Sequence, residues 1–137
     1  MALEILNTKI ELEKRLATGF PGVQIAYPSV SFTPPSNTLY LRCQMSIGKP
    51  DDPVFGIKYR RENITFQVFV VAPYNKGEAE AFTTAQQIAE LYARGTSISV
   101  SNILIRMFES PHISGSMIID NRVIVPVMIP VVVQVFN

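Results

Sequence analysis

The chain has 137 residues, a length that suits one domain with a single core. Only 17% of the residues are charged, against about 25% in an ordinary soluble domain, which predicts that much of the surface is covered in use. A net charge of +1 excludes strong electrostatic recruitment to nucleic acid or to an anionic membrane, and a single cysteine excludes an internal disulfide and a multi-cysteine metal site, as expected of a protein made in a reducing cytoplasm.

Residues 2–17 are expected to form a helix with two apolar stripes, and charges in its opening turns argue against a signal peptide. At 100° per residue, one stripe holds Leu3, Leu6, Ile10 and Ala17, and the other holds Ile5, Leu12 and Leu16. One stripe can pack on the protein's own sheet while the other serves a partner. Alternatively, both belong to one wide buried face over which Lys9 and Glu13 snorkel.

A short strand is expected over Val23–Tyr27, then a proline-containing loop, and then a clear alternation over residues 38–47. The alternating apolar positions of this strand are Leu39, Leu41, Cys43, Met45 and Ile47. We therefore expect Cys43 to be an inert core side chain.

Gly48–Gly56 is expected to be an exposed loop. In Ile57–Val71 the apolar positions change from odd to even, which predicts a bulge near Arg61–Asn63 and a protruding hairpin before it. The only basic cluster of the sequence, Lys58, Arg60 and Arg61, lies here. It either contacts phosphate or pairs with Asp51, Asp52 and Glu62, across the hairpin or on a neighbouring subunit.

A second amphipathic helix is expected over residues 78–93, followed by strands at Ile98–Val100, Ile103–Phe108 and Ile113–Ile119 and a tight turn at Asp120–Asn121. The pattern predicts one α+β domain over residues 1–137, in which two helices pack on a mixed, mainly antiparallel sheet with a protruding hairpin or loop.

The last segment, Val123–Phe136, is almost entirely apolar and β-branched, and its prolines exclude a membrane-spanning helix. Pro126 and Pro130 share parity, so both missing N–H donors fall on one edge of the strand. We therefore expect a long edge strand that is paired regularly on one side only. Its length predicts surplus apolar surface, which would meet another subunit.

The sequence contains no clear catalytic, phosphate-binding or metal-binding motif. His112 has no His or Cys companion at metal-ligand spacing, and Ser114-Gly115-Ser116 resembles a nucleophile elbow only superficially. No phosphate-binding or dinucleotide-binding glycine motif is present, and Asp51-Asp52 lacks nearby carboxylates for a cation site. We expect no enzyme, no cofactor and no metal.

Several short motifs follow one another in a recognisable order. They are Arg15-Leu16-Ala17, Ile25-Ala26-Tyr27, Phe32-Thr33-Pro34-Pro35, Leu39-Tyr40-Leu41-Arg42, Phe66–Pro73, Gly77, Ala93-Arg94-Gly95-Thr96 and Val125-Pro126-Val127. This ordered set resembles the small phage tail terminator proteins, the tail-completion family related to minor tail protein U. The long apolar C-terminus departs from the family, where a more polar ending is expected.

The resemblance implies a ring, usually of six subunits, that caps the head-proximal end of the tail tube. Such a ring stops addition of tube protein, joins the filled head through a head-completion protein, and lets DNA pass without sequence-specific binding. It would be a virion protein assembled in the host cytoplasm, without membrane contact. The subunit-interface candidates are Leu3, Leu6, Ile10, Val131, Val133 and Val135. The candidates for contact with the tube or a neighbour are Asp51, Asp52, Lys58, Arg60 and Arg61.

Two alternatives remain open from the sequence. The chain could be another tail or head–tail connector component, such as a tube or stopper protein. It could also be a small dimeric ligand-binding domain or enzyme that uses His112 and Glu109.

Overall fold

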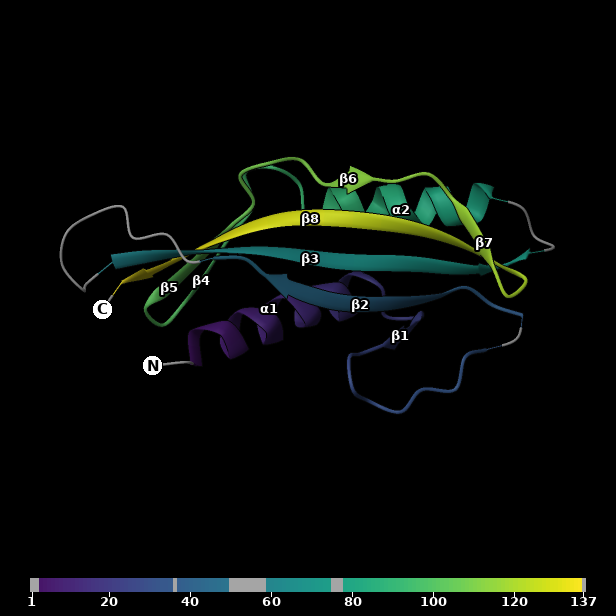
Figure 1. The fold of residues 1–137 in the computed structure, drawn as a ribbon, viewed down its shortest axis with the longest axis horizontal. Coiled ribbons are helices and arrows are strands. Elements are labelled where there is room, and N and C mark those ends of the chain that lie inside the picture. The colour runs from purple at the N-terminus through teal and green to yellow at the C-terminus, as the bar shows by residue number, and fades with distance from the viewer. Residues whose placement is uncertain (1–2, 36, 50–58, 75–77, 137) are drawn as a thin grey trace.

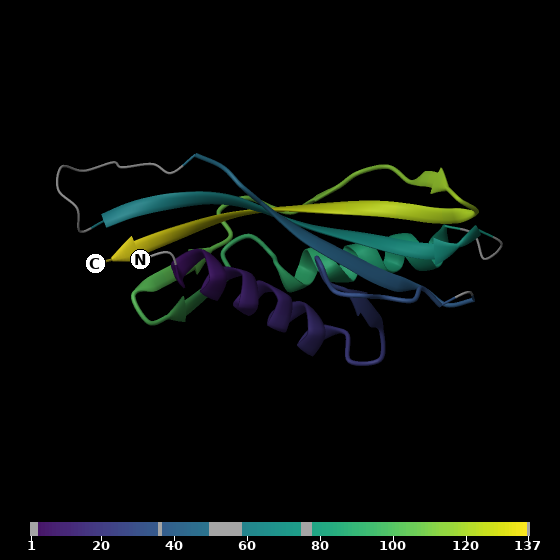
Figure 2. The same cartoon turned by 60° about the horizontal axis from the view of Figure 1, so that its bottom comes forward.

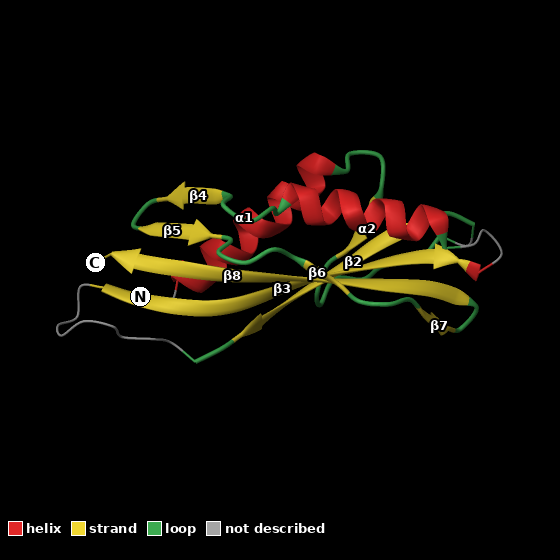
Figure 3. Cartoon of the chain, turned by 90° about the horizontal axis from the view of Figure 1, so that it is seen from above, coloured by secondary structure: helices red, strands yellow, loops and turns green. Residues whose placement is uncertain are grey.

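The computed structural model describes residues 3–35, 37–49, 59–74 and 78–136 (Figure 1). Both helices cover one face of an eight-stranded sheet, whose other face carries no helix in the described residues (Figure 3). The elements, in chain order, are α1 Leu3–Gly19, β1 Gln24–Ala26, β2 Tyr40–Ile47, β3 Tyr59–Pro73, α2 Ala79–Leu91, β4 Ser97–Val100, β5 Ile103–Arg106, β6 His112–Ile113, β7 Met117–Ile119 and β8 Arg122–Phe136. We call the helix-covered side the inner face and the opposite side the outer face.

The sheet order is β1-β2-β3-β8-β5-β4, and β6 and β7 also pair with β8. Only the β1–β2 pair is parallel, so the predicted mixed, mainly antiparallel α+β fold is confirmed. The predicted protruding hairpin falls on residues 50–58, outside the described residues.

The spine of the sheet is the antiparallel pair β3–β8. Each strand has 15 residues, which corresponds to a length of about 50 Å. Their register runs without interruption from Tyr59 opposite Phe136 to Pro73 opposite Arg122. The predicted bulge near Arg61–Asn63 is therefore wrong. The apolar positions change from odd to even residues for another reason. Arg60 and Glu62 occupy inner-facing positions of β3 as an ion pair in place of apolar side chains.

The prediction that Val123–Phe136 forms an edge strand is also wrong, because β8 has neighbours on both sides. The proline argument itself is confirmed. The carbonyl of Pro126 accepts a hydrogen bond from Ser114 N–H, and Phe136 N–H donates to Asn102, so even-numbered residues point away from β3. On that edge the ladder is broken into short pieces against β5, β6 and β7, while the β3 edge is continuous.

The core lies between the helices and the inner face of the sheet. Leu12 and Leu16 of α1 and Ala85 and Ile88 of α2 are completely buried against it. Tyr92, just after α2, fastens the helices together because its hydroxyl donates a 2.6 Å hydrogen bond to the carbonyl of Leu12. The helices cover the inner face of β8, and this explains how a small domain hides so long an apolar strand.

The C-terminal third follows the prediction with two changes. The expected strand Ile113–Ile119 is split into β6 and β7, and β6 begins at His112, one residue before the expected start. The expected tight turn is confirmed, since Asp120 and Asn121 have φ angles of 51° and 60° between β7 and β8. Loop residue Phe32 covers one end of the outer face, where it stacks on Tyr40 beside Val71 and Ile124.

Candidate assembly surfaces

The first candidate surface is the solvent side of α1. Leu6 and Ile10 are 49% and 48% exposed one turn apart, whereas Leu12 and Leu16 are fully buried. Lys9 and Glu13 form a 2.8 Å ion pair along the helix. The two-stripe interpretation is therefore correct, and the single wide face is excluded. Leu3 begins the helix on the same stripe, but its side chain lies outside the described residues.

The structure corrects the other half of the predicted interface. Val131, Val133 and Val135 point to the inner face of β8 and are no more than 1% exposed. They belong to the core of their own subunit because the helices and the neighbouring strands already cover them. A partner would have to contact the outward side chains of this strand, which alternate with them.

The predicted basic cluster is largely neutralised within the chain. Arg60 donates to Glu62 at 2.8 Å and to Glu4 of α1 at 3.0 Å, and both carboxylates are more than 90% buried. Arg60 does pair with Glu62, but along the same strand and not across the hairpin or on a neighbouring subunit as predicted, and a phosphate role for this side chain is not supported. Arg61 points outward and is half-buried, while Asp51, Asp52 and Lys58 lie outside the described residues.

The Glu4–Arg60 contact joins the start of α1 to the start of β3, near the end of β8 (Figure 2). Burial alone would raise the pKa of Glu4, but hydrogen bonds from its own backbone and from Arg60 hold it below its ordinary value of 4.5. The pKa of Arg60 is raised, mainly by its hydrogen bond with Glu62. These shifts favour the ionised forms of both Glu4 and Arg60, so the buried cluster contains a carboxylate and a guanidinium that are both charged.

The outer face of the sheet is the second candidate surface. Its outward positions on β2, β3, β5 and β8 carry four arginines and no carboxylate among the described residues, and the arginines are Arg42, Arg61, Arg106 and Arg122. Three of them stack on aromatic rings. The distance from the guanidinium carbon to the ring centroid is 4.9 Å for Arg42 on Phe69, 5.0 Å for Arg106 on Phe108 and 5.3 Å for Arg122 on Tyr40.

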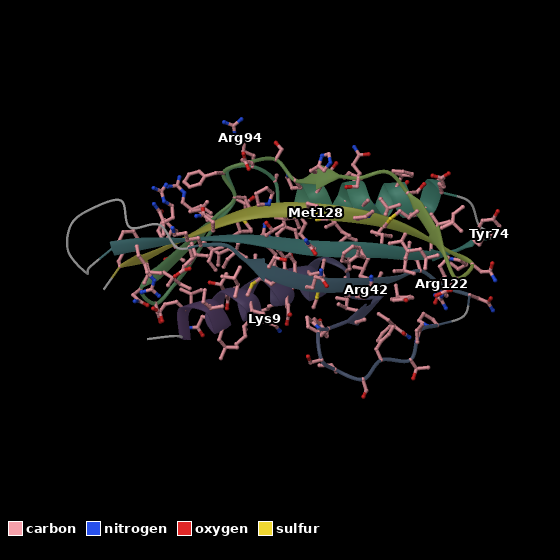
Figure 4. The ribbon with its side chains drawn as sticks, viewed as in Figure 1. Lys9, Arg42, Tyr74, Arg94, Arg122 and Met128 are labelled. Atoms are coloured by element: carbon pink, nitrogen blue, oxygen red, sulfur yellow. The ribbon has the colours of Figure 1, made fainter. Side chains whose placement is uncertain are left out.

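These ring contacts hold the guanidinium groups in place without neutralising them. Arg122 also donates to the carbonyl of Pro35 at 3.0 Å, but within the described residues no carboxylate pairs with Arg42, Arg106 or Arg122. Arg42 and Arg122 lie in the same half of the molecule as Tyr74 (Figure 4). The outer face therefore presents ordered positive charge.

A groove of about 550 Å³ crosses this outer face where the β8 ladder is interrupted. Thr65, Pro130 and Val132 form part of its lining, together with Ile47 from β2 and Phe108 from the loop after β5. Glu109 is the carboxylate at its border. The mixture of arginine, aromatic and aliphatic side chains on this face is the composition that protein interfaces favour.

The remaining candidates show no catalytic arrangement. His112 and Glu109 are both exposed, and within the described residues no three His, Cys, Asp or Glu side chains gather closely enough to hold a metal ion. Cys43 is 1% exposed, as predicted, and burial raises the pKa of its thiol to about 12. Neither described helix has the length and apolar character needed to span a bilayer.

Sequence reasoning missed Glu4 as the partner of Arg60 and the arginines of the outer face as a group. The alternation of β2 does place Arg42 outward, so this parity is a usable signal. Finding Arg106 and Arg122 on the same face requires the pairing of β5 with β8, which one sequence does not show.

Comparisons with known proteins agree with this architecture. A family model described as phage tail terminator protein matches residues 9–130. A solved structure that is 23% identical has a TM-score of 0.75, with 95% of each chain covered, and so has the same fold. A search of curated proteins gives no significant match.

Proposed function

Because the chain belongs to the phage tail terminator family, we propose that it forms a ring of six copies at the head-proximal end of the tail tube. Membership of this family gives the chain a structural role in the phage tail. In the proposed position the ring ends the addition of tube protein and offers the surface that joins the filled head. Genomic DNA passes through its lumen without sequence-specific contacts, and the ring assembles in the host cytoplasm before it becomes part of the virion.

The observation that carries the proposal, beside the family match, is the uncovered apolar side of α1. Leu6 and Ile10 are half-exposed on a helix whose opposite side is fully packed. A closed ring uses a heterologous contact, in which two different surfaces of each subunit meet. The α1 stripe of Leu3, Leu6 and Ile10 supplies apolar area for one of these two surfaces.

Docking to the tail tube is proposed for the segment between β2 and β3, which contains Asp51, Asp52 and Lys58. Reversal of both aspartates to lysine is expected to leave the ring intact and to impair docking to the tube protein. Docking that is unimpaired would remove these residues from the proposed contact. The opposite side of the ring is proposed to receive the head-completion protein.

The ring is tested by light scattering and electron microscopy of the purified chain, which are expected to show particles of about six subunit masses with a central hole. The double variant Leu6→Lys/Ile10→Lys should remain folded and lose the ring. Val30→Lys, at a side chain that is 61% exposed elsewhere, is the matched control and should keep it. A wild-type chain that stays monomeric at high concentration, with or without tail tubes, would contradict the proposal.

Function is tested in tail assembly. Without a working terminator, tubes are expected to grow past their normal length and to fail to join heads. The Leu6→Lys/Ile10→Lys variant should reproduce that defect, whereas His112→Ala should leave tail joining intact. Loss of joining in His112→Ala would favour a role for the His112–Glu109 region.

A further inference from the structure

Resting on the proposed ring, we infer that its subunit contact joins the arginine-bearing outer face of one subunit to the helical layer of the next, which carries the acidic solvent side of α2 and the exposed apolar stripe of α1. The partner of the outer face is thus a second copy of this chain. Opposite layers of one subunit provide the two halves of the contact, because α2 covers the inner face and the arginines occupy the outer face (Figure 3).

The basic half has unused hydrogen-bonding capacity. Arg42 is exposed and Arg122 is half-buried; they are stacked on Phe69 and Tyr40, and neither has a carboxylate partner within the described residues. A guanidinium fixed on a ring keeps its N–H edge free for a carboxylate and loses little side-chain entropy when it binds one.

The acidic half lies on α2 and at the residue before it. Glu78, Glu80 and Glu90 are exposed, and α2 contains no lysine or arginine. The exposed residues between them are mostly uncharged and polar, including Thr83, Gln86 and Gln87. By contrast, α1 carries equal numbers of both charges, three acidic and three basic side chains, so the acidic character of the helical layer belongs to α2.

The spacing of the two sets of charges is compatible. Ideal sheet geometry separates the Cα atoms of Arg42 and Arg122 by about 16 Å, since they are four residues and two strands apart in register. Ideal helix geometry separates those of Glu80 and Glu90 by about 15 Å. Two ion pairs can therefore form at once when α2 lies diagonally across β2, β3 and β8.

A protein partner fits this face better than a nucleic acid does. Met128, Pro130 and Val132 lie between the arginines and are partly exposed. Of these, Pro130 and Val132 line the 550 Å³ groove together with Phe108 and polar groups. Such apolar area gains nothing from a phosphate backbone, while it suits a packed interface. The net charge of +1 also gives the chain little general attraction for DNA.

The test reverses the two halves separately in the full-length protein. Arg42→Glu/Arg122→Glu and Glu80→Lys/Glu90→Lys should each raise the dissociation constant of the subunit contact at least about tenfold, because like charges then face each other. Circular dichroism should show both variants folded, since within the described residues none of the four side chains makes an ion pair. Lys49→Glu/Arg94→Glu is the matched control. Both side chains are exposed and lie outside α2, the α1 stripe and the outward strand positions, and the change in net charge equals that of the first variant, so the ring should persist.

Mixing the two defective variants gives the sharpest outcome. In an alternating ring every contact again joins opposite charges, so an equimolar mixture should form rings although neither variant does alone. The quadruple variant should form rings by itself. If wild-type protein forms rings but neither the equimolar mixture nor the quadruple variant does, the inferred contact is wrong and the proposed function still stands.

The nucleic-acid alternative has its own outcome. If Arg42→Glu/Arg122→Glu forms normal rings but loses a salt-sensitive affinity for duplex DNA that the wild-type ring shows, the outer face binds phosphate and the inferred contact is wrong. If wild-type protein forms no rings under any condition, the proposed function itself fails.

Discussion

The two faces of the sheet are built from alternate residues of the same strands, yet they differ in nearly every property. Along β8 the inward side chains are buried valines and isoleucine, while the outward ones include Arg122, Met128 and Gln134. Charge that lies inside, at Glu4 and Glu62, is paired with Arg60. On the outer face Arg42, Arg106 and Arg122 are stacked on rings, and no carboxylate pairs with them in the described part of the chain. The inner face thus serves folding, and the outer face has the composition of a surface for assembly.

The largest expected difference between the two faces comes from substituting aspartate at two neighbouring residues of β8. Val133→Asp places a charge in the fully buried inner layer and should destabilise the fold by more than about 4 kcal/mol, enough to unfold the monomer. Val132→Asp, one residue away on the outer face, should cost about 1 kcal/mol and leave the monomer folded. Denaturant unfolding followed by circular dichroism measures both.

Equal effects of the two substitutions would show that the faces do not differ as described. A folded but unassembled Val133→Asp variant would restore the sequence-based interpretation, in which Val133 belongs to a subunit interface.

Helix α1 carries the same contrast on a smaller scale. Leu12→Ala should lower the free energy of unfolding by about 2–5 kcal/mol, because it leaves a cavity beneath the helix. Leu6→Ala, on the exposed stripe, should change it by less than about 0.5 kcal/mol and should weaken assembly instead. Urea unfolding of the monomer and light scattering separate the two effects, and a large loss of stability in Leu6→Ala would place that side chain in the core.

Much of this contrast could be predicted from local sequence. The alternation of residues 38–47 placed Leu41 and Cys43 inside, the 100° spacing separated Leu6 from Leu12, and Asp120-Asn121 gave the turn. These features depend on neighbours within a few residues, where periodicity and turn chemistry operate. The two prolines of β8 likewise revealed which edge would be irregular.

The rest depends on contacts between distant segments. The charges at Arg60 and Glu62 suggested a bulge because their partner, Glu4, lies 56 residues from Arg60 in the sequence. The apolar C-terminal strand suggested an interface because a single sequence does not show that both helices lie along it. In both cases the explanation is a contact within the same subunit. Glu4 pairs with Arg60, so no bulge is needed, and the helices cover the apolar strand, so no partner subunit is needed there.

The paired charge beneath α1 gives a pH-dependent prediction. Glu4→Gln should lower the free energy of unfolding by about 1–2 kcal/mol at neutral pH, because it weakens a charge-assisted hydrogen bond to Arg60. The folded pKa of Glu4 is lowered, so its contribution is complete above its unfolded value of 4.5 and is lost as the pH falls through the folded pKa. Wild type and variant should therefore converge in acid, which thermal unfolding between pH 7 and pH 3 measures. A difference that is independent of pH would exclude the ion pair as its source.

The smallest expected difference in the free energy of unfolding is between two variants that each remove one hydrogen bond, one on each face. Tyr92→Phe removes the buried bond to the Leu12 carbonyl and should cost about 1 kcal/mol, because the acceptor stays in a site without solvent. Gln67→Ala removes the exposed bond between Gln67 and Gln44 on the outer face and should cost less than about 0.5 kcal/mol, because water replaces the lost partner. Paired urea titrations at one pH resolve the two values. If Gln67→Ala proves the more costly, the outer face contributes to the folding of the monomer, and its separation from the inner face is less complete than the structure indicates.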